Sequence, residues 1–188
     1  MNYVQHMKIA VTLMIASSLI LGSCGQDSSS DVADSISDSK SATVSLPDGI
    51  FLNKAPEDTT PIPDLKMTAK EGDEVLIHVV IGGRVRPFVD NRSIMMVVQA
   101  TMSNPCNISG DHCKTPWDYC CTPTQTLTNN LATVQIIDAQ GQPLKVNLET
   151  ASPLKPMSTL RVQGIVGPRP DKQTLVVNAT GIYIENAP

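Results

Sequence analysis

The feature that most limits the fold of this chain is a series of short apolar runs rich in β-branched residues. Residues 75–81 (Val-Leu-Ile-His-Val-Val-Ile) are apolar at nearly every position. A strand with one face in water would alternate apolar and polar side chains, so this run predicts a central strand that is buried on both faces. Residues 93–101 form a second apolar run, and the turn residues Pro87, Asp90 and Asn91 separate the two runs.

The composition favours a fold made of short strands. The 188-residue chain contains 14 prolines and 11 glycines, which interrupt it often. Aromatic residues make up only 3% of the sequence, so Val, Ile, Leu and Met must build the core. No stretch has a sustained helical period, and the sequence therefore predicts a mainly β fold.

The second half of the chain contains further candidate strands. Residues 132–138 are typical of a strand, and residues 139–142 are typical of a turn. Residues 144–148 then alternate apolar and polar side chains, as a half-buried hairpin partner does. Residues 160–166 alternate again, and residues 174–184 form a last apolar run. This half therefore predicts a hairpin followed by two more strands.

The order of these segments resembles the OB-fold. That fold has a long bent first strand, a hairpin, a strand with the pattern Val-x-Gly-x-Val, a loop and a final strand. The matching pieces here are residues 75–85, 134–141, 162–166 and 175–184. The resemblance implies a small OB-fold-like β-barrel over residues 65–188. A β-sandwich is the alternative fold.

The chain departs from the OB pattern in two places. Residues 86–130 form a large insertion that contains a cysteine-rich loop, residues 103–129, and no helical segment precedes residue 160. By the OB analogy, the cysteine-rich loop falls between the first and second barrel strands, where this fold often places ligand contacts.

The N-terminus has the pattern of an export signal. Lys8 precedes the apolar run 9–21, which is too short for a transmembrane helix. The run ends in Leu-Gly-Ser followed by Cys24, which resembles the bacterial lipobox. The resemblance implies that residues 1–23 are a signal peptide and that Cys24 carries a diacylglycerol on its sulfur and an acyl chain such as palmitate on its amine. An ordinary cleaved signal with a chance cysteine is the alternative.

Residues 24–64 are predicted to link the lipid anchor to the domain. Residues 25–44 are rich in Ser and Asp, and they cannot bury enough apolar surface to offset the entropy of ordering. Residues 45–64 are rich in proline. Gly25 is not the Asp of lipoproteins retained in the inner membrane, so the resemblance implies an outer-membrane anchor facing the periplasm. The chain is also similar to uncharacterised lipoproteins of planctomycete-like bacteria.

Four cysteines lie close together in the second half of the chain. They are Cys106, Cys113, Cys120 and Cys121, with the spacing C-x6-C-x6-C-C. An even number of cysteines in an exported domain is typical of disulfide bonds. Adjacent cysteines rarely bond each other because the small ring is strained, so the adjacent pair is predicted to bond the other two, in one of two connectivities. Each bridge would contribute about 2–3 kcal/mol.

The same cysteines could instead hold a metal ion. Four thiolates suit zinc or copper(I), and His112 could replace one of them. Asp111 or Asp118 could orient the histidine through a hydrogen bond. Zinc sites usually contain two closely spaced cysteine pairs, which this chain lacks. Thiol exchange is a third alternative, although the sequence has no C-x-x-C motif.

The cysteine-rich loop also contains the side chains best suited to recognition. They are Asp111, His112, Trp117, Asp118 and Tyr119. Polar and aromatic groups on a rigid loop are typical of contact surfaces. The alternative is that the aromatic rings only pack over the sulfurs.

The sequence contains no complete catalytic constellation, since it lacks G-x-S-x-G, H-E-x-x-H and a glycine-rich phosphate loop. A net charge of −4 and few aromatic residues exclude single-strand nucleic-acid binding. We therefore expect a non-enzymatic cell-envelope lipoprotein, without a cofactor, that presents a disulfide-stapled β domain for binding or structural roles. Its partners would be the membrane, through the lipid, and an envelope protein. A zinc-binding or copper-binding lipoprotein is the alternative function.

The lipobox resemblance makes the first testable prediction. Replacing Cys24 by Ala removes the sulfur that receives the diacylglycerol, so metabolic labelling with a radioactive fatty acid should be lost. The variant should leave the membrane fraction as soluble or uncleaved protein. Membrane anchoring that is undiminished in Cys24→Ala would contradict the lipoprotein assignment.

Overall fold

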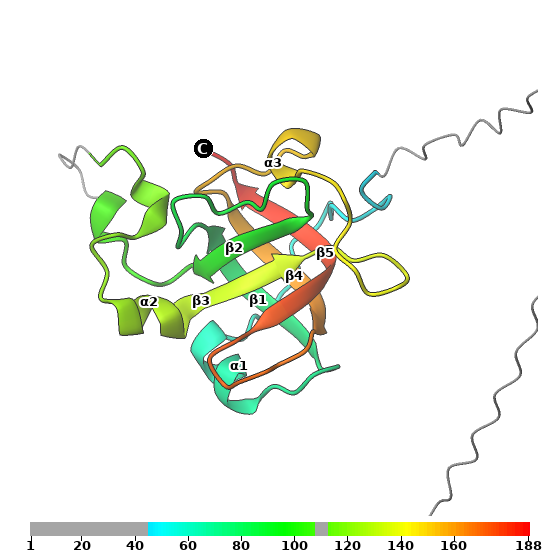
Figure 1. Ribbon diagram of the computed structural model, residues 1–188, viewed down its shortest axis with the longest axis horizontal. Coiled ribbons are helices and arrows are strands. Elements are labelled where there is room, and N and C mark those ends of the chain that lie inside the picture. The colour runs from blue at the N-terminus through cyan, green and yellow to red at the C-terminus, as the bar shows by residue number, and fades with distance from the viewer. Residues whose placement is uncertain (1–44, 108–112) are drawn as a thin grey trace, which may run out of the picture. The chain divides into compact units, whose positions relative to one another are not determined.

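The computed structural model describes residues 45–107 and 113–188 (Figure 1). Contacts divide the chain into two units, residues 1–40 and 41–188, and all described residues lie in the second unit. The predictions for Cys24, Asp111 and His112 fall outside the described residues. In the part of the chain that is described, no helix is long and apolar enough to cross a membrane.

Five strands form a closed barrel with the strand order β1-β2-β3-β5-β4. The strands are β1 (Glu74–Ile81), β2 (Ile94–Gln99), β3 (Leu131–Gln135), β4 (Thr159–Val166) and β5 (Val176–Asn186). β3 and β5 pair in parallel, and all other neighbours pair antiparallel. A small five-stranded barrel of this kind is the architecture of the OB-fold. The predicted OB-fold-like barrel is therefore confirmed, and the alternative of a two-sheet sandwich is wrong.

The core lies inside the barrel and consists of aliphatic side chains, as the scarcity of aromatic residues predicts. Along β1, Val75, Ile77, Val79 and Ile81 point inward and are buried, and the residues between them are exposed or half-buried. The prediction that this strand is buried on both faces is therefore wrong. The N-terminal segment runs over part of its outer face, where the Thr60 amide donates to the Leu76 carbonyl (2.8 Å) and where Leu76 is half-buried.

The folded unit extends N-terminal of Leu65, into the stretch that was predicted to be a linker. Ile50 and Ile62 belong to the core, and Phe51 forms a bridge with Ile182 on β5. Helix α1 (Ile62–Thr68) lies at one end of the barrel (Figure 1). The Ile62 amide donates to the Gln99 side-chain oxygen (2.8 Å), which attaches the start of the helix to β2.

The C-terminal end of α1 is attached to the loop between β4 and β5. The Arg169 guanidinium donates to the carbonyl oxygens of Leu65, Lys66 and Ala69. These carbonyls have few partners within so short a helix, and a cation also suits the negative end of the helix dipole. The residues that were called a linker are thus fastened to the barrel at both ends of α1.

Two sequence-based predictions on the later part of the chain are wrong. Residues 144–148 form no strand, and only a single bridge pairs Ile137 with Pro143. Helix α3 (Leu148–Ala151) precedes β4, where no helix was predicted. Asn147 caps it by accepting a hydrogen bond from the Glu149 amide (3.0 Å). Asn as an N-cap with Glu in the first turn is a sequence signal for such a helix start.

The cysteine-rich loop lies between β2 and β3, and not between the first and second strands as the OB analogy suggested. The error arose because residues 93–101 were counted as part of an insertion, although they form β2. The loop contains two 3-10 helices, η1 (Pro105–Asn107) and η2 (Pro116–Asp118), and ends in α2 (Thr124–Asn130), which leads directly into β3.

The alternation of burial along β1 can be tested with a pair of neighbouring substitutions. Ile77→Ala removes a side chain with no exposed surface and should lower the free energy of unfolding by about 2–5 kcal/mol. Leu76→Ala removes a side chain on the outer face of the strand and should cost less than half as much. Urea denaturation measures both values, and equal losses would contradict the inward and outward assignment.

Candidate functional site

Two glycines after β1 allow the cysteine-rich loop to lie directly against the barrel. The Gly83 amide donates to the Trp117 carbonyl (2.7 Å), and the Trp117 indole donates to the Val85 carbonyl (3.0 Å). A Cβ atom at Gly82 would lie 2.5 Å from the Trp117 carbonyl oxygen. Gly83 has a positive φ of 84°, which other residues rarely adopt. The close packing of the loop against the barrel therefore depends on this glycine pair.

Side-chain hydrogen bonds hold the interior of the loop together. Asn104 donates to the Pro116 carbonyl (2.9 Å) and accepts from the Cys106 amide (3.0 Å), so it connects η1 to η2. The Asp118 carboxylate accepts from the Cys120 amide (2.8 Å) and from the Thr115 hydroxyl (3.0 Å). These bonds bring the cysteines of three chain segments to one place.

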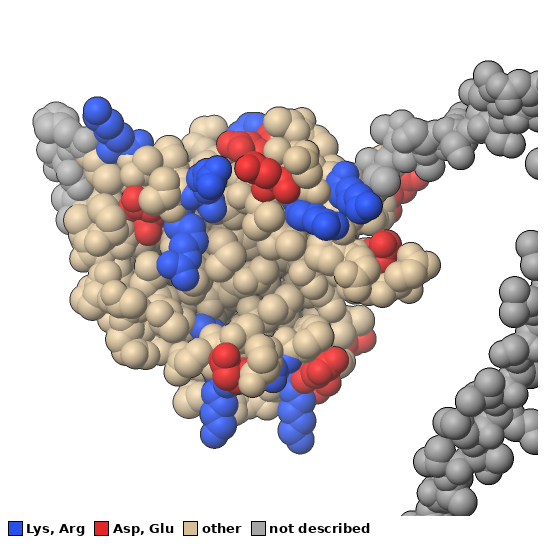
Figure 2. All heavy atoms as spheres, in the orientation of Figure 1, with Lys and Arg blue, Asp and Glu red and all other residues tan. Residues whose placement is uncertain are grey.

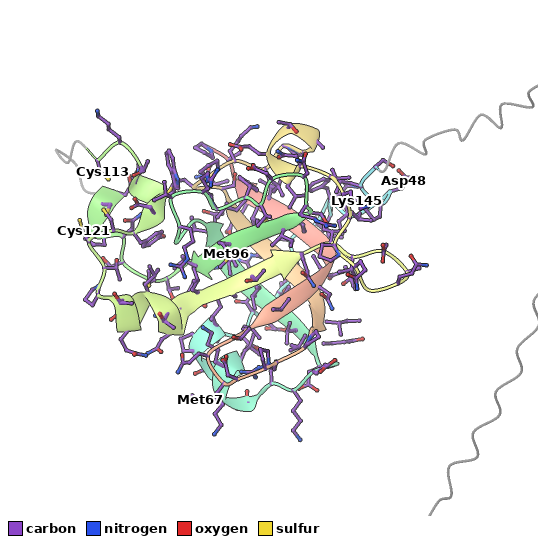
Figure 3. The ribbon with its side chains drawn as sticks, in the orientation of Figure 1. Asp48, Met67, Met96, Cys113, Cys121 and Lys145 are labelled. Atoms are coloured by element: carbon purple, nitrogen blue, oxygen red, sulfur yellow. The ribbon has the colours of Figure 1, made fainter. Side chains whose placement is uncertain are left out.

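Sulfur atoms gather at this point of the loop (Figure 3). The Sγ atoms of Cys106 and Cys120 are 3.4 Å apart, and those of Cys120 and Cys121 are 3.8 Å apart. One ligand atom from each of Cys106, Cys113, Asp118 and Cys120 lies within 4.8 Å of the other three. The Cys121 amide also donates to the Cys106 sulfur (3.4 Å).

Cys106 and Cys120 differ in acidity because they share a hydrogen bond. Burial raises the pKa of the Cys106 thiol, but hydrogen bonds from the Cys121 amide and from the two neighbouring thiols more than offset this, and the pKa is lowered. The hydrogen bond to Cys106 raises the pKa of Cys120, and Asp118 raises it further.

The prediction of two disulfides stays a prediction. Cys106, Cys113 and Cys120 have free thiols in the structure, and the 3.4 Å between the Cys106 and Cys120 sulfurs exceeds the roughly 2.05 Å of an S–S bond. The predicted pairing of the adjacent cysteines with Cys106 and Cys113 is compatible with their closeness. A metal ion is compatible with it as well.

The predicted recognition residues are not equally accessible. Trp117 and Asp118 are half-buried, whereas Tyr119 is only 3% exposed and packs inside the loop. Burial raises the pKa of the Tyr119 hydroxyl. Tyr119 has a positive φ of 58° and turns the chain so that Asp118 and Cys120 lie on either side of it. This ring therefore serves mainly to support the loop.

Two hollows lie beside α2, and the second of them extends onto the outer surface of β2 and β3. A hollow of ≈ 310 Å³ beside the cysteine-rich loop is lined by Arg84, Asp118, Tyr119, Cys120, Thr128 and Leu131, among others. A second hollow of ≈ 170 Å³ is lined by Lys66, Arg84, Met96, Thr128, Leu131, Thr133 and Gln173, among others. The two hollows share Arg84, Thr128 and Leu131 as lining residues, so they adjoin each other, and together they are called the groove below. Figure 2, in the orientation of Figure 1, shows a mainly uncharged surface over β2 and β3.

Met96 and Arg84 line this groove, although no motif in the sequence marks them as binding residues. Methionines were expected to build the core, but Met96 lies half-buried on the outer face of β2, where Thr133 donates to its sulfur (3.6 Å). Because alternate residues of a strand face opposite sides, an inward-facing Met95 implies that Met96 faces outward. Arg84 is exposed and lines both hollows of the groove.

A buried lysine closes the far end of the groove. The Lys66 ammonium donates to the Thr128 carbonyl (2.5 Å), and the residue as a whole is 6% exposed. Burial, with a smaller contribution from the Arg169 cation, lowers the pKa of Lys66 from 10.5 to about 8. Between pH values of about 8 and 10.5, the Lys66 side chain is protonated in the unfolded chain but mostly neutral in the folded protein. The free energy of unfolding should therefore rise as the pH rises through this range.

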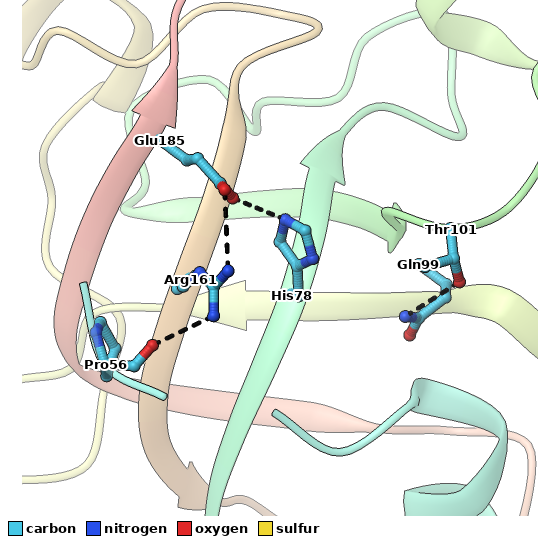
Figure 4. Close-up of polar contacts among 6 residues, drawn as sticks. All are labelled: Pro56, His78, Gln99, Thr101, Arg161 and Glu185. Atoms are coloured by element: carbon cyan, nitrogen blue, oxygen red, sulfur yellow. Dashed lines mark hydrogen bonds and ion pairs between the residues drawn. The ribbon is translucent and has the colours of Figure 1, made fainter. Parts of the chain in front are cut away.

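His78 belongs to a different polar cluster, on the outer face of the barrel (Figure 4). Its Nε2 atom lies 2.7 Å from a carboxylate oxygen of Glu185, whose other oxygen lies 3.6 Å from Arg161. Arg161 also donates to the Pro56 carbonyl (3.2 Å). The cluster therefore fastens the N-terminal segment to β4 and β5.

A larger hollow of ≈ 520 Å³ lies against β1 and β4, and its lining includes Asp58 and Glu74 but no Lys, Arg, His or Cys. Size alone therefore does not identify the functional site. The groove beside the cysteine-rich loop combines the Cys120 thiol, the Arg84 guanidinium and apolar residues such as Leu131, and it is the candidate site.

The closed barrel places the chain among OB-fold-like proteins. No family model matches the sequence, and the search of curated proteins finds no match. A solved structure that is similar in chain path is the OBody AM1L10 bound to hen egg-white lysozyme. The two chains are 12% identical, the match covers 72% of this chain and 98% of the OBody, and the TM-score is 0.39. The fold assignment rests on the strand order and not on this similarity.

The role of Gly82 in positioning the loop can be tested with the single tryptophan as reporter. Gly82→Ala would press a methyl group against the Trp117 carbonyl, so it should cost about 1–3 kcal/mol and shift the fluorescence of Trp117 toward that of exposed indole. Gly167→Ala is the matched control, because a Cβ atom there meets no atom closer than 3.4 Å. Identical spectra for Gly82→Ala and the unsubstituted chain would contradict this role.

Proposed function

We propose that this protein is a non-enzymatic lipoprotein of the cell envelope whose barrel binds an envelope protein through the groove on β2 and β3. The observation that carries the proposal is the pair of adjoining hollows that form the groove, whose lining residues extend from the cysteine-rich loop past Arg84 to Gln173 in the loop before β5. In OB-fold proteins, ligands commonly bind on the outer face of strands 2 and 3. This is an analogy of fold, and the chemistry of the groove has to support it.

The lining of the groove suits an extended polypeptide segment. Leu131 and Met96 supply apolar surface, and Thr128 and Thr133 supply groups that donate and accept hydrogen bonds. Arg84 is exposed, and no ion pair to it is present among residues 45–107 and 113–188. An exposed guanidinium beside apolar surface favours a partner with a carboxylate next to apolar side chains.

The expected location is consistent with such a partner. The lipobox-like N-terminus predicts an outer-membrane anchor facing the periplasm, so the partner would be another envelope protein. The groove lacks the stacked aromatic rings that single-stranded nucleic acids require, since Tyr119 is its one aromatic lining residue among the described residues and is buried.

Site-specific photo-crosslinking in intact cells tests this function. A photoreactive amino acid at Thr133, on the floor of the groove, should give a discrete adduct with one envelope protein. The same amino acid at Thr180, in the lining of the larger hollow on the other strands, is the positional control and should not give this adduct.

A pair of charge reversals makes the test specific. Arg84→Glu should reduce the adduct from Thr133 at least about tenfold, the effect of losing one charge-assisted contact and adding a repulsive one. Arg86→Glu alters an exposed arginine that pairs with Asp90 at 3.7 Å and does not line the groove, so it should leave the adduct unchanged. Equal adducts from Thr133 and Thr180, or equal effects of the two reversals, would refute the groove as the binding site.

A further inference from the structure

The sulfur cluster carries an inference that is independent of the groove. We propose that Cys106, Cys113, Cys120 and Asp118 bind one zinc ion, with three thiolates and one carboxylate oxygen as its ligands. The four residues come from three segments of the cysteine-rich loop, so the ion would join η1, the segment before η2 and the turn after it.

The spacing of the ligand atoms fits a tetrahedral ion. Two thiolates bound to one zinc at about 2.3 Å lie about 3.8 Å apart. The Cys106 and Cys120 sulfurs are 3.4 Å apart, and all four ligand atoms lie within 4.8 Å of one another. Small rotations of the side chains would bring each atom to its coordination distance. A disulfide between Cys106 and Cys120 would leave unexplained why Cys113 and Asp118 lie at the same point.

The surroundings of the ligands have the hydrogen bonds that metal sites use to orient their ligands. Asp118 is held by the Thr115 hydroxyl and the Cys120 amide, and each carboxylate oxygen keeps a second lone pair for a metal. The Cys121 amide donates to the Cys106 sulfur, an arrangement that stabilises a thiolate. Cys106 is buried and Cys120 is exposed, so the ion could enter from the side of Cys120.

The combination of three thiolates with one carboxylate favours zinc over copper(I). Thiolates alone would suit copper(I) as well as zinc, but a carboxylate oxygen is a hard ligand that zinc accepts and copper(I) disfavours. A four-ligand site with no open position is typical of structural zinc. Its effect would be to close the loop at three points, and since Asp118 and Cys120 also line the groove, the ion would hold one rim of it in place.

The test uses the full-length protein, purified from membranes in detergent without reductant or chelator. Elemental analysis should find about one zinc per chain, and thiol titration should find the cluster cysteines reduced. Replacement of zinc by cobalt(II) should give the absorption bands of a tetrahedral cobalt thiolate. These readouts depend on the metal site and not on any partner of the groove.

Variants then assign the ligands. Cys106→Ser and Cys120→Ser should each weaken zinc binding by about 100-fold or more, measured by competition with a chromophoric chelator, since loss of an outer-shell partner alone costs roughly 10- to 100-fold. Cys120 is exposed, so its variant remains informative even if the buried Cys106 cannot be replaced without unfolding.

Asp171→Asn is the matched control for Asp118→Asn. Asp171 also accepts a backbone amide and a threonine hydroxyl within a turn, but it lies in the loop between β4 and β5. Asp118→Asn should weaken zinc binding at least tenfold, and Asp171→Asn should not change it. Equal effects of the two would overturn the carboxylate ligand. Protein that is purified with two disulfides and without zinc would overturn the site, even if it binds zinc after reduction.

Discussion

The structure depends on closing a small sheet into a barrel, so that β4 can pair with β1 on one side and with β5 on the other. Five strands close only if the sheet coils sharply, and the pairing of β4 with β5 supplies the bend through an irregularity between Gln163 and Gly164. A side chain at Gly164 would collide with the Asn178 carbonyl, and one at Gly181 would collide with the Gln163 side chain. Without this close approach, β4 and β5 could not pair along their length, and the aliphatic core would be uncovered on that side.

Closure also determines where the protein can interact. A closed barrel has no unpaired strand edge, so binding has to use loops and the outer faces of strands. The long connection from β2 to β3 lies against the Gly82–Gly83 bend and forms one end of a groove, and the loop before β5 forms the other. The proposed zinc site and the proposed binding groove are therefore neighbours that share Asp118 and Cys120, although each can be tested without the other.

Much of the strand pattern could be predicted because a strand shows its own period. Residues 160–166 alternate in the sequence and alternate in burial along β4. Alternation wrongly predicted a strand at residues 144–148. No strand forms there because Pro143 has no amide to donate to a neighbouring strand and because helix α3 begins at Leu148. The expectation that methionines build the core fails at Met96, because an apolar side chain on a half-covered outer face looks like a buried one in sequence. Contacts of the N-terminal segment with β1 and β5 were not predictable, since proline-rich sequence gives no sign of its packing partner.

The sequence by itself determined that the chain is mainly β, that its core is aliphatic, and that four cysteines lie within sixteen residues of one another. Short-range patterns carry this information because alternation and chain spacing are local properties. Only the tertiary structure decided that Asp118 joins three of the sulfurs, and that Arg84, Thr128 and Leu131 meet in one groove. These residues come from separate segments, and strand register together with the packing of the loop against Gly82 brings them together.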